Sequence, residues 1–150
     1  MSPDTELASA EPGQRVDAVY GPVTPAQLVR YAGASGDYNP IHYNHFYAVE
    51  AKLGGVVAHG MLTMAFMGRA LTDRMGPSGR VVRIAARFTS LVRPGDAIAV
   101  TIGVTARRTT ATTTEVDCDL VARVGDRDVA GGSATLAWPL GNGRFDGSRG

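Results

Sequence analysis

The sequence predicts a single α+β domain, and two observations lead to that prediction. Apolar residues recur with helical spacing in the first half of the chain, most strongly from about residue 60 to residue 74. From Val81 onward the pattern changes to a period of two, which is typical of strands with one buried face. Helices followed by a run of antiparallel strands that wraps a buried helix form an α+β arrangement.

The domain is expected to begin with a short strand around residues 15–20. The helix that follows has a well-marked start, because Thr24 suits the N-cap position and Pro25 suits the first helical position. This helix should end in the glycine-rich stretch at residues 33–36. A second, short helix is predicted from about residue 44 to residue 52.

The next helix is predicted from about Gly60 to Arg74, and it should end at Gly76-Pro77. Its apolar residues cover nearly the whole circumference: Met61, Leu62, Met64, Ala65, Phe66, Met67 and Leu71. A helix that is apolar all round is a buried one. We therefore expect this helix to lie in the interior, across one face of a sheet.

The strands of the second half should place their apolar residues on one face of that sheet. The inward sets are Ile84, Ala86 and Phe88, then Ile98, Val100, Ile102 and Val104, then Val116, Cys118, Leu120 and Ala122, and finally Ala134, Leu136 and Trp138. Turns at Pro94-Gly95-Asp96 and Gly125-Asp126 interrupt the alternation. Cys118 is the single cysteine, and its inward position predicts a buried, unreactive thiol in a reducing compartment.

Composition and charge exclude several classes of protein. A net charge of +1 over 150 residues argues against a nucleic-acid partner. The start of the chain is acidic and polar, unlike a signal peptide, and the longest apolar run is too short and too polar to span a membrane. We therefore expect a cytoplasmic protein. Residues 1–13 and 140–150 are predicted to be flexible tails, which leaves 14–139 as the folded domain.

A short loop brings a carboxylate and an imidazole close together along the chain. It reads Gly36-Asp37-Tyr38-Asn39-Pro40-Ile41-His42, and the Asn-Pro step makes a turn because the residue before a proline is pushed out of the α region. A rigid loop suits two titratable groups, so Asp37 and His42 could hold one water as an acid/base pair. Alternatively, Asp37 is a turn residue and His42 is a surface side chain. The loop alone favours neither interpretation.

The segment Ala58-His59-Gly60-Met61 stands at the start of the buried helix. The amide of Gly60 would be unpaired there, at the positive end of the helix dipole. Such a donor stabilises the oxygen that becomes negative when the α-carbon of a thioester gains or loses a proton. Alternatively, the glycine is present only because the backbone is crowded. His59 is expected to be structural and to bond the loop.

Other kinds of chemistry receive little support. Of the three histidines, His59 lies far along the chain from the other two and no cysteine joins them, so no metal site is predicted. The glycines lack the spacing of a nucleotide-binding loop, so no cofactor is predicted. Covalent catalysis is disfavoured because none of the candidate nucleophiles stands in a Gly-x-Ser-x-Gly elbow: Ser35, Thr63 and Ser90.

The loop and the helix start, in this order and at this spacing, resemble the motifs of the MaoC-like, or (R)-specific enoyl hydratase, family. The likeness extends from about Arg15 to Trp138 and includes the strand end at Phe88 and the turn Pro94-Gly95-Asp96. Within the family, the chain is most similar to the mycobacterial (3R)-hydroxyacyl-ACP dehydratases.

This resemblance implies a hot-dog fold, in which an antiparallel sheet wraps a long central helix and two sheets join in a dimer. It implies Asp37 and His42 as the acid/base pair, Asn39 as an orienting residue and the Gly60 amide as the oxyanion donor. The implied reaction is the reversible syn addition of water to a trans-2-enoyl thioester of CoA or acyl carrier protein, without a cofactor. The product is an (R)-3-hydroxyacyl thioester.

The chain departs from the family at one position, because some single-subunit hydratases carry a serine on the central helix where this chain has Gly68. Two alternative functions remain. One is an acyl thioesterase of the same fold. The other is a non-catalytic subunit of a heterodimer, which would be expected to lack Asp37 or His42. A homodimer is the expected assembly, and a heterodimer with a second hot-dog subunit is the alternative.

Overall fold

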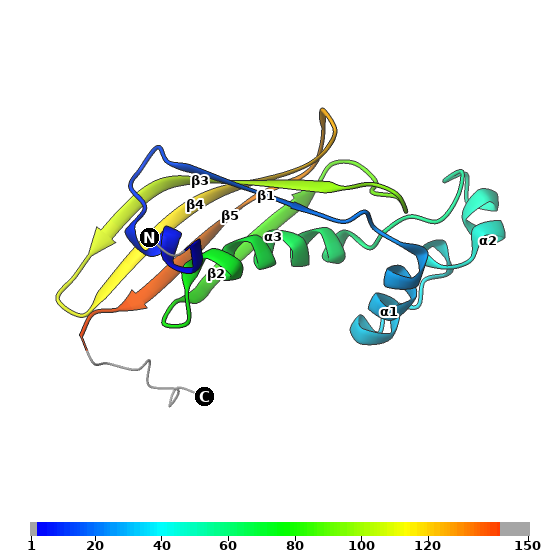
Figure 1. The fold of residues 1–150 in the computed structure, drawn as a ribbon. Coiled ribbons are helices and arrows are strands. Elements are labelled where there is room, and N and C mark those ends of the chain that lie inside the picture. The colour runs from blue at the N-terminus through cyan, green and yellow to red at the C-terminus, as the bar shows by residue number, and fades with distance from the viewer. Residues whose placement is uncertain (1–2, 142–150) are drawn as a thin grey trace.

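The computed structural model describes residues 3–141 and consists of one sheet with a long helix across it (Figure 1). All neighbouring strands are antiparallel, in the order β1-β3-β4-β5-β2. The strands are β1 (Arg15–Tyr20), β2 (Arg80–Phe88), β3 (Ile98–Thr109), β4 (Thr113–Val124) and β5 (Arg127–Pro139). The helices are α1 (Pro25–Ser35), α2 (His45–Glu50) and α3 (Gly60–Met75), with short 3₁₀ segments η1 (Pro3–Ser9) and η2 (Pro40–His42).

The hydrophobic core lies between α3 and the sheet, as the apolar periodicity predicts. The inward residues of β3 and β4 are buried at alternate positions, and β5 adds further buried residues to the same core; Ile102, Leu120 and Leu136 are 0–1% exposed. From the helix side, Met67 and Leu71 are fully buried in the same cluster. The helical and strand periods therefore agree on a single core.

The outer side of α3 is less buried than its composition predicts. Met61 is 54% exposed and Ala65 is also exposed, whereas Leu62, Phe66 and Ala70 are buried. The reason is that the sheet covers one side of the helix, and no element within residues 3–141 covers the other side at Met61 and Ala65.

The prediction of a flexible tail at residues 1–13 is wrong for the described part of that segment. Pro3–Ser9 forms η1, which packs on α3, and Leu7 is fully buried in the core. Arg107 donates hydrogen bonds to the carbonyl oxygens of Ala8 and Ala10, which ties the segment to β3. The predicted C-terminal tail at 140–150 lies almost entirely outside the described residues.

Local signals at α1 appear where the sequence places them. The Thr24 side chain accepts a hydrogen bond from the amide of Gln27, and the helix ends at Gly36, whose φ of 73° is left-handed. In Figure 1, α1 and α2 lie together beyond the N-terminal end of α3. The Asp37–His42 loop connects them, so it lies at that same end of the central helix.

Cys118 is buried on β4, as predicted, and its burial raises the pKa of the thiol to about 11. Such a thiol stays protonated and unreactive at neutral pH. Among residues 3–141, no helix has both the length and the apolar character required to cross a membrane.

Asp117 makes the fold of the sheet sensitive to acid. Its carboxylate accepts hydrogen bonds from Arg108 and Thr135, which lower the pKa of that carboxyl. A carboxylate with a lowered folded-state pKa stabilises the fold fully above its unfolded value near 4, and that stabilisation is lost as the pH falls through the folded value. Asp117→Asn should therefore cost about 1 kcal/mol of unfolding free energy at pH 7.

Thermal unfolding of the Asp117→Asn variant and the wild type between pH 2.5 and 7 measures this effect. The difference in Tm should be largest at neutral pH and shrink below about pH 4. Asp119→Asn is the matched control, because Asp119 is exposed on the same strand and its carboxylate has no ion pair within residues 3–141. A difference that stays constant with pH would contradict the prediction.

Candidate active site

The loop after α1 is held in shape by a series of local hydrogen bonds between side chains and the backbone. The Ser35 hydroxyl donates to the carbonyl oxygen of Tyr31 and accepts from the amide of Asp37. In turn, Asp37 Oδ1 accepts from the amide of Asn39, and Asn39 Oδ1 accepts from the amide of Ile41. Asp37 Oδ1 is thereby held by the backbone, and Oδ2 is free to face His42. The Asn39 side chain acts on the backbone at the start of η2.

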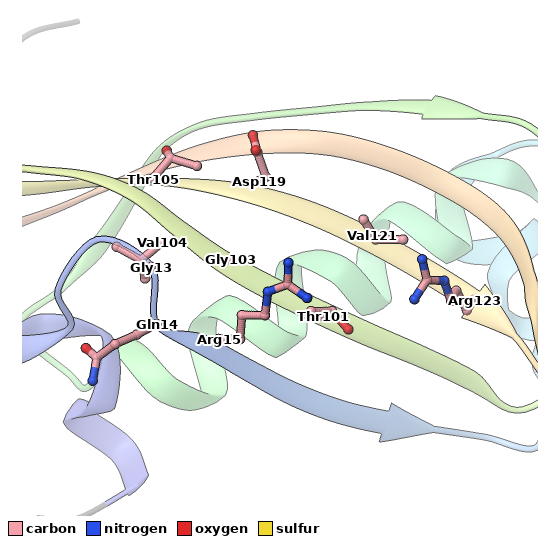
Figure 2. A pocket seen from close by; sticks show the side chains of 10 residues that line it. All are labelled: Gly13, Gln14, Arg15, Thr101, Gly103, Val104, Thr105, Asp119, Val121 and Arg123. Atoms are coloured by element: carbon pink, nitrogen blue, oxygen red, sulfur yellow. The ribbon is translucent and has the colours of Figure 1, made fainter.

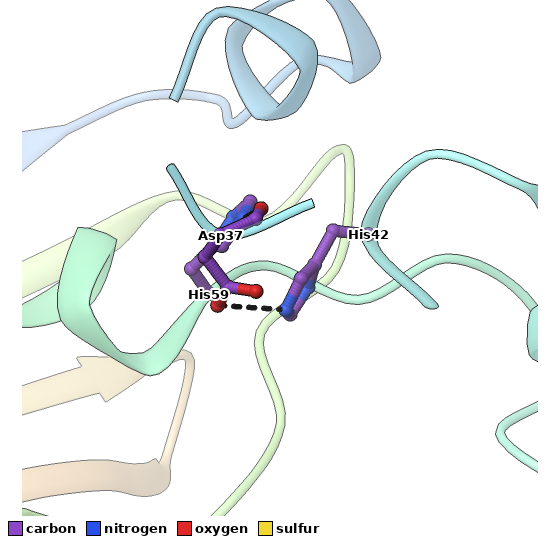
Figure 3. Close-up of side chains that lie close together, drawn as sticks. All are labelled: Asp37, His42 and His59. Atoms are coloured by element: carbon purple, nitrogen blue, oxygen red, sulfur yellow. Dashed lines mark hydrogen bonds and ion pairs between the residues drawn. The ribbon is translucent and has the colours of Figure 1, made fainter. Parts of the chain in front are cut away.

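His42 is buried at the end of η2, at 7% exposure, and its ring is fixed by one strong contact. Nδ1 lies 2.7 Å from the carbonyl oxygen of Val57, which can only accept, so the proton is on Nδ1. Nε2 of the neutral ring therefore carries a lone pair. It lies 3.7 Å from Asp37 Oδ2, and Figure 3 shows the two side chains facing each other. The Asp37 side chain is 52% exposed, which leaves it accessible to water.

Gly60 is the first residue of α3, where backbone amides have no partner inside the helix. A Cβ built on Gly60 would lie 2.9–3.1 Å from three carbons of the Phe88 ring. The amide of Gly60 thus stands at a helix N-terminus, and the position is also crowded by a side chain of β2.

A pocket of about 270 Å³ opens beside His42 and Gly60. Most of its wall is apolar, and the two hydroxyls that line it belong to Thr63 and Ser90. The complete lining is Ile41, His42, Val57, Ala58, Gly60, Thr63, Phe88, Ser90, Leu91 and Val92. The pocket thus joins the Asp37–His42 loop, the start of α3 and the connection from β2 to β3.

The sequence motifs do not reveal the part of this wall formed by Phe88, Leu91 and Val92. These residues follow the helix by more than ten positions, and only the fold brings them to the loop. The turn residue Arg93 helps to hold this arrangement, because its guanidinium donates hydrogen bonds to the carbonyl oxygens of Leu53 and Gly55.

A larger hollow of about 390 Å³ lies on the outward face of the sheet (Figure 2). Its charged residues are Arg15, Asp119 and Arg123, and Arg123 is already paired with Asp128. None of the predicted site residues lines it. It has no titratable pair comparable with Asp37 and His42, so the smaller pocket is the better candidate for catalysis.

His59 joins the pair more closely than the sequence indicates. Its Nε2 donates to the carbonyl oxygen of Asp37, at 3.1 Å, which confirms the expected bond to the loop. Its ring also stacks on His42, with centroids 3.6 Å apart and planes 21° apart. Ligand atoms of Asp37, His42 and His59 lie within 4.8 Å of one another, while His45 lies outside this cluster.

This cluster has donors of the type that bind zinc, but the ring geometry does not fit an ion. A metal is bound about 2.0–2.1 Å from an imidazole nitrogen, along the lone pair in the ring plane. The stacked planes of His42 and His59 do not meet near their nitrogens, so one ion cannot lie in both. In addition, Nδ1 of His42 and Nε2 of His59 are engaged with carbonyl oxygens.

Gly68 lies away from this site. A Cβ built there would come nearest to Cδ1 of Ile84, at an ordinary distance of 3.9 Å, and Gly68 does not line the pocket. Within this chain, a serine hydroxyl at position 68 would therefore face β2. On α3, the hydroxyl that lines the pocket beside His42 belongs to Thr63, one turn into the helix.

Comparisons with known proteins agree with this fold. The profile of the MaoC like domain family matches residues 8–124. The chain is 34% identical over 84 residues to the (R)-specific enoyl-CoA hydratase of Rhodospirillum rubrum, covering 55% of this chain and 58% of that protein. It is 40% identical over 81 residues to the fatty acid synthase subunit beta of Aspergillus oryzae, covering 52% of this chain and 4% of that protein.

Among solved structures, the unliganded R-hydratase from Pseudomonas aeruginosa superposes with a TM-score of 0.76. The two chains are 23% identical, and the alignment covers 98% of this chain and 97% of the other. This likeness shows the fold, and the predicted hot-dog architecture is confirmed. The chain spans less than two thirds of the length of the two curated relatives named above.

Proposed function

Because this chain belongs to the MaoC-like domain family, we propose that it hydrates trans-2-enoyl thioesters reversibly to (R)-3-hydroxyacyl thioesters. The observation that carries the proposal is the Asp37–His42 pair, whose facing atoms lie 3.7 Å apart beside a mostly apolar pocket. The enoyl-CoA hydratase named among the relatives supports the choice of reaction.

In the proposed reaction, Asp37 and His42 hold one water between them. The carboxylate oxygen and the unprotonated Nε2 both accept hydrogen bonds, and one water can lie about 2.8 Å from each. Its oxygen adds to C3 of the enoyl group, and a proton passes through the pair to C2. The two new bonds form on one face of the double bond because both side chains stand on one loop.

We assign the amide of Gly60 to the thioester oxygen. Negative charge develops on that oxygen when C3 is attacked, and an unpaired amide at a helix N-terminus stabilises it. Phe88, which lies against Gly60, closes one side of the pocket. The apolar walls then surround the acyl chain.

We also propose that the protein acts as a dimer with joined sheets, in the cytoplasm. The sheet ends in two open edge strands, β1 and β2, and Val82 on β2 is 49% exposed. The outward side of α3 at Met61 is also uncovered. Light scattering after gel filtration tests this: twice the chain mass supports a homodimer, and the mass of one chain contradicts it.

The activity test follows the enoyl absorbance of crotonyl-CoA in the presence of the protein. Loss of that absorbance, with (R)-3-hydroxybutyryl-CoA as product, supports the proposal. A thiol-detection assay on a saturated acyl-CoA runs in parallel, and release of thiol would identify a thioesterase instead. Inactivity towards both CoA and acyl-carrier-protein enoyl thioesters would overturn the hydratase proposal and favour a non-catalytic subunit.

A further inference from the structure

We infer that His59 is a positioning residue, which holds both members of the Asp37–His42 pair in register for the reaction. This inference rests on the proposed function. His59 is 2% exposed and precedes Gly60, at the N-cap position of α3. Its side chain makes no capping hydrogen bond to the helix, so the ring is directed elsewhere.

The first contact of His59 is with the backbone of Asp37. Nε2–H donates to that carbonyl oxygen at 3.1 Å, across 22 positions of sequence. The other hydrogen bonds of Asp37 among the described residues are local, to Ser35 and Asn39. His59 therefore links the backbone of Asp37 to the start of α3, where the Gly60 amide lies.

The second contact is with the ring of His42. One hydrogen bond, to Val57, fixes Nδ1 of His42 but leaves the ring free to tilt about that contact. Stacking at 3.6 Å against His59 opposes this tilt. Tyr31 packs against the His59 ring at 4.9 Å and 58°, so His59 is itself held in place.

An orphaned atom indicates that this position requires an imidazole. Nδ1 of His59 is buried and has no hydrogen-bond partner among the described residues. A buried acceptor without a partner is unfavourable. A phenylalanine could stack on His42 without introducing a buried acceptor. The imidazole is the side chain that makes both contacts, and it does so without lining the pocket.

Three substitutions separate the two contacts. Gln places its amide nitrogen near the position of histidine Nε2, Asn places its nitrogen near that of Nδ1, and Phe keeps a ring without a donor. His59→Phe and His59→Asn should lower kcat by about 10- to 100-fold, since misplacement of reacting groups by about 1 Å costs that much. His59→Gln should recover part of this loss. KM should stay within about threefold, because His59 does not line the pocket.

His45→Gln is the matched control, since His45 is exposed and lies outside the cluster. Equal kcat in wild type, His59→Phe and His59→Asn would overturn the inference while leaving the hydratase proposal intact. A rise in KM with unchanged kcat would also overturn it. If the wild type itself is inactive, it is the proposed function that fails.

A spectroscopic measurement tests the inference without any substitution. Nitrogen NMR of the wild-type imidazoles should show His42 protonated on Nδ1 and His59 protonated on Nε2. The opposite tautomer at His59 would remove the hydrogen bond to Asp37, and this result would overturn the inference. Because this measurement uses the wild-type protein, it can be made even if the His59 variants do not fold.

Discussion

Asp37→Asn and His42→Ala should each lower kcat for enoyl-thioester hydration by about 10²–10⁴-fold. Asparagine keeps the shape of Asp37 and can still accept from the Asn39 amide, but it cannot take a proton from water. Alanine at position 42 removes the Nε2 lone pair that faces the carboxylate. Loss of enoyl absorbance from crotonyl-CoA measures both effects.

Two controls separate chemistry from folding in this experiment. Circular dichroism and Tm should show that the Asp37→Asn variant remains folded, because the Asp37 side chain is half exposed. His45→Ala removes an exposed histidine three positions from His42 and should retain the wild-type rate. Rates unchanged by Asp37→Asn and His42→Ala would remove the proposed roles of both residues, and the family membership would stand.

Gly132→Ala should produce the largest loss of stability. A Cβ at this position would lie 1.9 Å from the carbonyl oxygen of Ala85 and 3.0 Å from Cα of Ala86. Both atoms belong to the backbone of β2, which pairs with β5 here, so no side chain can move aside. We expect a cost of about 3 kcal/mol or more, and a fall in Tm of about 6–12 °C.

The adjacent glycine provides a matched control for that substitution. A Cβ on Gly131 would meet its nearest atom, the carbonyl oxygen of Leu120, at an ordinary 3.8 Å. Gly131→Ala should therefore keep Tm within about 2 °C of the wild type. Similar Tm values for the Gly131→Ala and Gly132→Ala variants would contradict the steric explanation.

Local patterns predict most of the fold, because the signals are contained in short windows of sequence. The apolar run from residue 60 predicts α3 to within one residue of its end, and Thr24 and Gly36 bound α1 as expected. The same reasoning fails for Leu7. A single apolar residue in a polar segment has no periodicity, and its burial depends on a gap beside α3 that exists only after folding.

The candidate site divides in the same way. Asp37 and His42 share one loop, and Gly60 begins a recognisable helix, so sequence motifs identify them. The stacking of His59 on His42 depends on the path of the chain between residues 42 and 59. The contribution of Phe88 depends on the position of β2 beside α3. No local signal in the sequence reports either arrangement.

The hydrogen bonds that fix Asp37 and His42 join residues between 31 and 59, and the second half of the chain adds walls to the pocket. In the proposed function, chemistry and selectivity are thus encoded in separate stretches of the sequence. Under the proposed function, substitutions at Phe88 or Leu91 should change the size of acyl group that fits, and they should leave the hydrogen bonds of Asp37 and His42 in place. Such a protein can acquire a new substrate without losing its reaction along the way.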